Sequence, residues 1–269
     1  MDAIRVGIAG LGTIGKVVAR KLANGEVPGV ELECVSVRDP VKAQDFLDGI
    51  GSHAHIYGIE SLAREADLVI ECAPASAFAE IAVPVLTAGK SFMAISAGQL
   101  LERSDLIELA KEYGGQIIVP TGALLGLDAV TAAAEGKINS VNMITRKPVK
   151  GLLGAPYLER RGIDIAGITE PLRIFQGSAR EAARGFPENV NVAAALALAG
   201  IGPDRTTIEI WADPALTRNV HRIVVDSDSA SFEMQIQNIP SDNPKTGRIT
   251  ALSVVAALRK FRAPLRVGT

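Results

Sequence analysis

Short apolar runs alternate with amphipathic stretches through the first 120 residues of the chain. The apolar runs have the length of buried strands, which we expect at residues 4–9, 32–37, 67–72, 91–96 and 116–120. The stretches between them have helical spacing and predict helices at residues 16–23, 41–47, 59–65, 78–88 and 104–113. Strands that alternate with helices across short links are typical of a parallel, doubly wound sheet.

The pattern changes after about Pro120. Alanine-rich segments predict helices at 122–135, entered through a glycine-containing turn, and at 189–198; a last helix is expected at 249–262. Alternation with a period of two predicts strands at 140–146, 205–211, 219–226 and 231–239, as in an antiparallel sheet with one wet face. The sequence thus predicts an α/β protein with a Rossmann-type domain at 1–120. A second α+β domain with a mixed or antiparallel sheet follows at 121–245, and residues 246–269 supply a helix that packs back on the first domain.

A glycine-rich turn stands between the first predicted strand and the first predicted helix. It reads Gly10-Leu11-Gly12-Thr13-Ile14-Gly15. Gly10 permits a tight turn, Gly12 lets the backbone approach a pyrophosphate, and Gly15 lets helix and strand pack closely. The amides at the helix start favour the phosphates. With 26 glycines in the chain the motif alone is weak, but its place in a βαβ unit predicts a dinucleotide site; a plain strand–helix turn is the alternative.

The end of the second strand bears on the choice between NAD and NADP. An NAD site usually carries an acidic residue there, to hold the ribose hydroxyls. Here Val37 occupies about that position, and Arg38 beside it can face a 2′-phosphate. Asp39 reaches the ribose if the register differs by one or two residues, and Arg38 is equally well a solvated loop residue. Both NAD and NADP therefore remain open as cofactors.

Turns of small residues follow other strands, at the sheet edge where cofactors bind in open α/β folds. They are Cys72-Ala73-Pro74, Ser96-Ala97-Gly98 and Gly122-Ala123. Small side chains there let backbone groups contact ribose and nicotinamide. Each turn is also explained by simple turn chemistry.

Composition and charge exclude several classes of protein. Of 269 residues 48% are hydrophobic, and the net charge of −2 gives no reason to expect a nucleic-acid partner. No uncharged run approaches the length of a membrane span, and the apolar N-terminal stretch is too short for a signal peptide. Cys34 and Cys72 lie in apolar runs without metal-ligand spacing, so we expect reduced thiols and a cytoplasmic protein.

Hydride chemistry also needs a group that moves a proton near neutral pH, and histidine is the usual one. His53 and His55 lie in a helix-poor stretch of the first domain and are expected to be solvated. His221 is the only histidine of the second domain. On a strand it shares a face with Asn219 and Ile223, which makes it the candidate catalytic residue; a structural histidine is the alternative.

Two further segments stand out by composition. Residues 177–182 lead through Phe186-Pro187 to an alanine-rich helix that begins near Asn189 and Asn191. Asparagine is a good helix cap, which explains one of the two but not both. Residues 239–247 form a polar loop rich in proline and glycine, which is explained at least as well by a surface turn.

The chain resembles the L-aspartate dehydrogenases along its full length. The resemblance rests on residues 10–15, 120–123, 126–129, 177–182, 186–187, 189–194, 212–214, Asn219, His221, 243–244 and 246–247. It implies oxidation of L-aspartate to iminosuccinate, which feeds NAD biosynthesis or hydrolyses to oxaloacetate and ammonia. It implies that His221 is catalytic, that Asn189 and the backbone of Ala123 contact the dinucleotide, and that the protein is a homodimer.

A dicarboxylate substrate needs cationic partners, and arginine is the best bidentate one. The second domain offers several candidates besides the polar Asn219, namely Arg146, Lys147, Arg180, Arg218 and Lys245. The sequence does not choose among them. Alternative functions are a dihydrodipicolinate-reductase-like or homoserine-dehydrogenase-like enzyme, or a redox sensor that binds NAD(P) without turnover.

Overall fold

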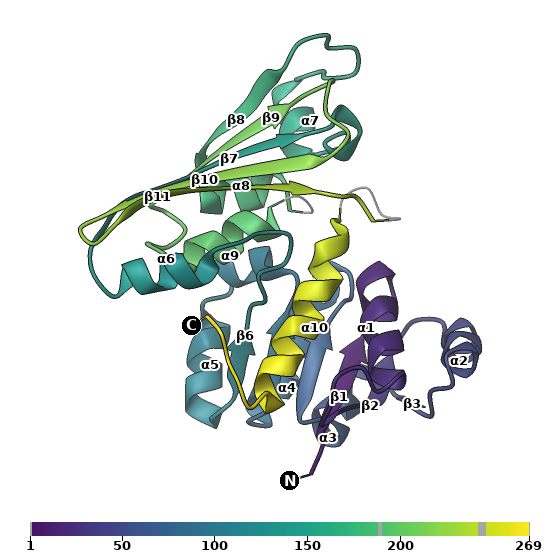
Figure 1. Cartoon of the computed structure of the whole chain (residues 1–269). Helices are drawn as coiled ribbons and strands as arrows, with labels where there is room; N and C mark the ends of the chain where they lie inside the picture. The colour runs from purple at the N-terminus through teal and green to yellow at the C-terminus, as the bar shows by residue number, and fades with distance from the viewer. Residues whose placement is uncertain (1, 188–189, 242–245, 269) are drawn as a thin grey trace. The chain divides into compact units, whose positions relative to one another are not determined.

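The computed structural model describes residues 2–187, 190–241 and 246–268. The chain forms two compact units (Figure 1). Unit 1 comprises residues 1–120 and 251–266, and unit 2 comprises residues 121–250 and 267–269. The chain thus leaves unit 1 once and returns to it through its last helix.

Unit 1 is built on a parallel sheet of six strands in the order β3-β2-β1-β4-β5-β6. The strands are β1 (Ile4–Ala9), β2 (Val30–Ser36), β3 (His55–Ile56), β4 (Leu68–Glu71), β5 (Ser91–Ala94) and β6 (Gln116–Ile118). The helices are α1 (Thr13–Ala23), α2 (Pro40–Gly49), α3 (Ile59–Glu65), α4 (Phe78–Thr87) and α5 (Asp105–Tyr113), with 3₁₀ turns at Ala75–Ala77 and Ala97–Leu101. The predicted doubly wound sheet is confirmed. The strand order reverses between β1 and β4, where such folds bind ligands.

Apolar side chains cover both faces of this sheet and form two cores. One core contains Val6, Ile8 and Ile70 together with Val254 and Leu258 of α10 (Arg248–Arg262), all fully buried. The other contains Val69 and Phe92 under α3, α4 and α5. A parallel sheet needs such cover on both faces, and α10 supplies part of it.

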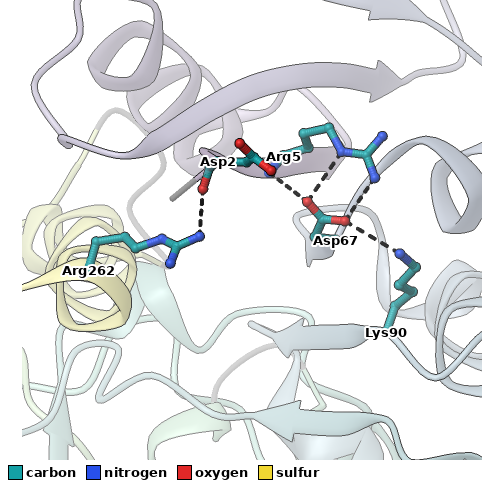
Figure 2. Close-up of polar contacts among 5 residues, drawn as sticks. All are labelled: Asp2, Arg5, Asp67, Lys90 and Arg262. Atoms are coloured by element: carbon teal, nitrogen blue, oxygen red, sulfur yellow. Dashed lines mark hydrogen bonds and ion pairs between the residues drawn. The ribbon is translucent and has the colours of Figure 1, made fainter.

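Polar contacts fix the ends of β1, β4 and α10 within unit 1 (Figure 2). The Arg5 guanidinium donates to both carboxylate oxygens of Asp67, at 2.9 and 3.2 Å, and the Lys90 ammonium lies 3.4 Å from the same carboxylate. Arg262 donates to the backbone carbonyl of Asp2 at 2.7 Å. The contacts tie the start of β1 to the start of β4 and to the end of α10.

Unit 2 contains a five-stranded sheet in the order β11-β10-β7-β9-β8. The strands are β7 (Ile138–Lys147), β8 (Leu172–Ser178), β9 (Thr206–Ala212), β10 (Asn219–Ser227) and β11 (Ser231–Asn238). Only β7 and β9 run parallel among these pairs, so the sheet is mixed. The helices are α6 (Leu127–Ala134), α7 (Pro156–Arg161), α8 (Ala179–Gly185) and α9 (Asn191–Ala199), with a 3₁₀ turn at Val149–Gly151.

Several elements differ from the sequence-based expectation. The structure adds β3, β8, α7 and α8, which the pattern did not predict. Helix α6 begins at Leu127 rather than at 122, because Gly126 adopts a positive φ of 65° just before it. The residue that caps α9 is Val190, without a side-chain hydrogen bond, so the expected asparagine cap is not seen at Asn191. Asn189 lies outside the described residues.

Candidate cofactor and catalytic sites

The turn after β1 has the conformation that its glycines predict. Gly10 has a φ of 100°, and its N–H donates to the carbonyl of Ser36 at 2.8 Å. A Cβ at Gly10 would lie 2.6 Å from the carbonyl oxygen of Cys72. A Cβ at Gly15 would collide with the carbonyl oxygen of Gly10. The fold itself therefore requires glycine at both positions.

Gly12 differs from its two neighbours in the motif. It is exposed, its φ is −78°, and a Cβ there would meet no atom within 4 Å. Neither the backbone conformation nor the packing explains glycine at this position. A ligand that approaches the backbone closely does explain it, so the turn fits a dinucleotide pyrophosphate.

Helix α1 completes this cradle. It starts at Thr13, has no acidic residue in its first turn, and no side chain caps its amides. The first amides of a helix have no partner inside the helix and attract anions. Leu11 and Ile14 are half-buried and pack against the unit 1 core, which holds the turn in place.

The end of β2 leaves Arg38 exposed and accounts for Asp39 structurally. The Asp39 carboxylate accepts from the Lys42 N–H at 3.1 Å as the cap of α2, which keeps the pKa of Asp39 below its usual value. Asp39 is thus engaged in capping rather than free to hold a ribose. The described side chains here offer a cation, Arg38, as the candidate contact to a 2′-phosphate.

A buried carboxylate, Glu71, lies at the carboxyl-terminal end of the central strand β4, beside this turn. It ends β4, is fully buried, and accepts from the Ser96 N–H at 2.8 Å and the Ser96 hydroxyl at 3.1 Å. Burial raises its pKa to about 7, against the effect of the Ser96 hydrogen bonds. Glu71 therefore ties the predicted Cys72-Ala73 turn, which packs on Gly10, to the turn after β5.

In unit 2, His221 is buried on the face of the sheet opposite to the open face that carries Arg222 and Gln235; we call the buried side the inner face. It is 1% exposed, and Asn219 and Ile223 are buried on the same face, as the period-two pattern predicts. Its Nδ1 lies 3.2 Å from the Thr145 hydroxyl, directly across the strand pair. Burial first, and the positive charge of Lys147 second, lower its pKa to about 3. The imidazole is consequently neutral at physiological pH.

Polar side chains surround His221 on this otherwise apolar face. Thr145 and Lys147 of β7, Asn219 of β10 and Asn238 of β11 are each at most 8% exposed. Across the strands, Asn219 lies opposite Asn238, and His221 lies opposite Thr145. These two cross-strand pairs are neighbours on the same face, at one end of β7, β10 and β11. We call Thr145, Lys147, Asn219, His221 and Asn238 the inner polar cluster. It combines a cation, a proton acceptor and amide groups.

The other cationic candidates lie elsewhere. Arg146 points to the opposite, open face of the sheet, where it pairs with Asp213 at 2.6 Å. Arg180 pairs with Asp204 at 2.6 Å at the start of α8, and Arg218 is exposed. Lys245 lies outside the described residues. Of the described candidates, the structure brings Lys147 and Asn219 to His221.

Two other features of the sequence are accounted for by the structure, whereas the polar loop at 239–247 lies partly outside the described residues. The segment from Gly177 forms a capping box at the start of α8, in which Ser178 and Glu181 satisfy each other's backbone N–H. His53 and His55 are exposed, as expected. Within the part of the chain that the structure describes, no three His, Cys, Asp or Glu side chains gather as metal ligands, and no helix is long and apolar enough to cross a membrane.

Two family profiles match the chain and define its class. Residues 10–120 match a profile described as "Homoserine dehydrogenase, NAD binding domain", and residues 128–261 match "Aspartate dehydrogenase, C-terminal". An NAD-binding unit joined to an aspartate dehydrogenase C-terminal unit places the chain in the class of nicotinamide-dependent oxidoreductases. The chain is 57% identical to L-aspartate dehydrogenase of Bradyrhizobium diazoefficiens, over 99% of this chain and 94% of that protein. It is 42% identical to L-aspartate dehydrogenase of Methanocella arvoryzae, over 98% and 99%. The chain belongs to the L-aspartate dehydrogenase family.

Solved structures share the fold. Aspartate dehydrogenase from Thermotoga maritima superposes with a TM-score of 0.73 at 23% identity and covers 98% of this chain and 99% of its own. Scyllo-inositol dehydrogenase from Lactobacillus casei, with bound NAD(H) and scyllo-inositol, gives a TM-score of 0.53 at 14% identity, over 97% and 88%. At these identities the likeness concerns the fold alone.

Proposed function

We propose that the protein oxidises L-aspartate to iminosuccinate with NAD or NADP as hydride acceptor. The observation that carries the proposal is a neutral, buried imidazole beside a buried ammonium, His221 and Lys147, in a chain of this family. Iminosuccinate then feeds NAD biosynthesis or hydrolyses to oxaloacetate and ammonia. Bound nicotinamide supplies an electrophilic ring that takes the hydride from Cα.

His221 removes the proton that the substrate amino group must lose. Its pKa of about 3 leaves the ring unprotonated before the reaction. The Thr145 hydroxyl lies 3.2 Å from Nδ1. In the tautomer that this role requires, Nδ1–H donates to Thr145 and Nε2 is the base. Thr145 is in this way a positioning residue for the imidazole.

Lys147 and Asn219 bind the substrate carboxylates. A buried ammonium favours an anion, and its charge also keeps the imidazole neutral. Lys147 lies on the face of His221, whereas Arg146, its neighbour in sequence, lies on the other face beside Asp213. The position of Lys147 on the face of His221 supports it over Arg146 as the substrate cation.

The glycine turn Gly10–Gly15, the start of α1 and the Cys72-Ala73 turn hold the dinucleotide. The family resemblance implies further dinucleotide contacts from Asn189 and from the backbone of Ala123. The absence of an acidic side chain free at the end of β2, among the described residues, supports use of both cofactors, with Arg38 on the 2′-phosphate of NADP. We also propose a cytoplasmic homodimer. Two free thiols support that compartment, and the family resemblance supports the dimer.

The experiment that tests the function follows L-aspartate oxidation by NAD and by NADP at 340 nm. His221→Ala should lower kcat by about two to four orders of magnitude, the usual contribution of a general base, with unchanged NADH affinity. His55→Ala, at an exposed histidine, is the matched control and should keep full activity.

Two results would contradict the proposal. Near-normal turnover by His221→Ala would remove the catalytic assignment. No cofactor reduction with L-aspartate, when homoserine or another amino acid is oxidised, would reject the substrate. A protein that binds NADH but reduces no cofactor with any amino acid would be a sensor.

A further inference from the structure

Asn238, the last residue of β11, has one amide atom paired and the other unpaired. It is 3% exposed, and its Nδ2 donates to the carbonyl oxygen of Ala123 at 2.8 Å. Since a carbonyl oxygen can only accept a hydrogen bond, the end of the Asn238 amide that faces Ala123 must be the NH₂ group, and this fixes the orientation of the amide. Its Oδ1 is buried and has no hydrogen-bond partner among the described residues.

The unpaired oxygen belongs to the inner polar cluster. Asn238 lies directly opposite Asn219, and His221 belongs to the next cross-strand pair on the same face. Gly247, joined to Pro240 by a backbone bridge, lies against the amide, and a Cβ there would come within 3.3 Å of Oδ1. The acceptor is therefore held rigidly by β11 and by its bond to Ala123, with only a hydrogen atom on the residue beside it.

A buried acceptor without a donor is unfavourable, and proteins tolerate it where a ligand supplies the donor. The charges in the cluster indicate what kind of ligand this is. Lys147 attracts the anionic part of a substrate, while a neutral amide oxygen binds an N–H or O–H. An α-amino dicarboxylate carries both kinds of group.

We propose that Asn238 Oδ1 accepts an N–H from the α-amino group of the substrate and thereby selects an amino acid over the corresponding hydroxy acid. The inference rests on the proposed function. Neutral His221 is one acceptor and Asn238 Oδ1 is a second. A hydroxyl has one proton and can satisfy only one of them, whereas an amino group has hydrogens for both.

The test compares Asn238→Ala with Asn238→Asp. The alanine variant removes the acceptor and the donor to Ala123; the aspartate variant keeps an oxygen acceptor, loses the donor and adds a carboxylate charge. Gln237→Ala, at the preceding residue on the exposed face of β11, is the matched control. For each variant we would measure kcat and KM for L-aspartate, KM for ammonia in the reverse direction, the rate with L-malate, and Kd for NADH.

Asn238→Ala should raise KM for aspartate and for ammonia about ten- to hundredfold, as expected for a lost hydrogen bond to a charged group, and should raise malate turnover relative to aspartate. Kd for NADH should stay within about twofold, because the acceptor serves the substrate. Asn238→Asp should keep a KM for aspartate much nearer the wild-type value.

Three results would overturn the proposal. Equal losses in the alanine and aspartate variants would show that Asn238 only holds the Ala123 turn. A rise in Kd for NADH by the same factor as KM would assign the oxygen to the cofactor carboxamide. An unchanged KM for aspartate in a folded Asn238→Ala protein would reject the role of Asn238 and leave the proposed function intact. A wild-type protein inactive on aspartate would reject both the role of Asn238 and the proposed function.

Discussion

Replacement of Glu71 by glutamine tests whether the buried carboxylate beside the glycine turn costs free energy when it ionises. The side chain is fully buried, and burial raises its pKa from 4.5 to about 7. The folded protein therefore holds a proton on Glu71 between pH 4.5 and 7 that the unfolded chain has already lost. Glu71 contributes stability that is fully present below pH 4.5 and is lost as the pH rises through 7.

The magnitude follows from the size of the shift. One pKa unit corresponds to about 1.4 kcal/mol, so this shift implies a loss of roughly 3 kcal/mol between pH 4.5 and pH 8. Glutamine does not ionise and escapes this loss. It also gives up one of the oxygens that accept from Ser96, at a cost of about 1–2 kcal/mol that does not depend on pH.

The assay is urea unfolding of both proteins at pH 5.0 and pH 8.5, with circular dichroism as the signal. The free energy of unfolding of Glu71→Gln, relative to wild type, should rise by about 2.5 kcal/mol from the lower pH to the higher. Glu60→Gln, at an exposed residue of α3, is the control and should show no such rise. A difference between Glu71→Gln and wild type that is the same at both pH values would refute the reasoning.

Three further predictions concern unit 1. Gly15→Ala should abolish dinucleotide binding or folding, because its Cβ collides with the Gly10 carbonyl; calorimetry that finds normal NADH affinity in a fully folded variant would contradict the close packing. Arg38→Met should raise KM for NADP about tenfold or more and leave KM for NAD unchanged, a split that equal effects on both cofactors would disprove. Asp67→Asn removes the negative charge from the contact with Arg5 in Figure 2. Because that contact lowers the pKa of the partly exposed Asp67 to about 2, its stabilisation exists above pH 3.8 and disappears as the pH falls through 2. Chemical denaturation should show a loss of at most about 1 kcal/mol at pH 7 and none near pH 2; an equal loss at both would exclude the ion pair as the cause.

The pattern along the chain predicts the elements that are long and regular. Strands β1, β2, β4 and β5 carry uninterrupted apolar runs, and the doubly wound sheet follows from them. Strand β3 has two residues, too few to show any period. Strand β8 shifts register between Arg173 and Phe175, which breaks the alternation that would have predicted it.

One missed element did leave a signal in the sequence. Ser178 and Glu181 stand three residues apart before an alanine-containing stretch, the spacing of a capping box, and they begin α8. The capping box accounts for the unusual composition of this segment.

For the candidate site, the sequence predicts only which residues of a single strand share a face. Period two places Asn219 and His221 on one face, which the structure confirms. It does not say which strand lies beside β10, so it cannot choose between Arg146 and Lys147 or include Asn238. Those residues join the cluster through cross-strand register, which depends on the pairing of segments distant in sequence.

The inner polar cluster lies on regular strands rather than on loops, and this limits how the protein can vary. Deletion of a single residue within β10 ahead of His221 would turn the imidazole to the side where Arg146 lies, and every later side chain of the strand would exchange faces with it. Hairpin and surface segments tolerate changes in length, whereas β7, β10 and β11 do not. New substrate preferences in such a scaffold therefore arise by exchange of side chains at constant strand length.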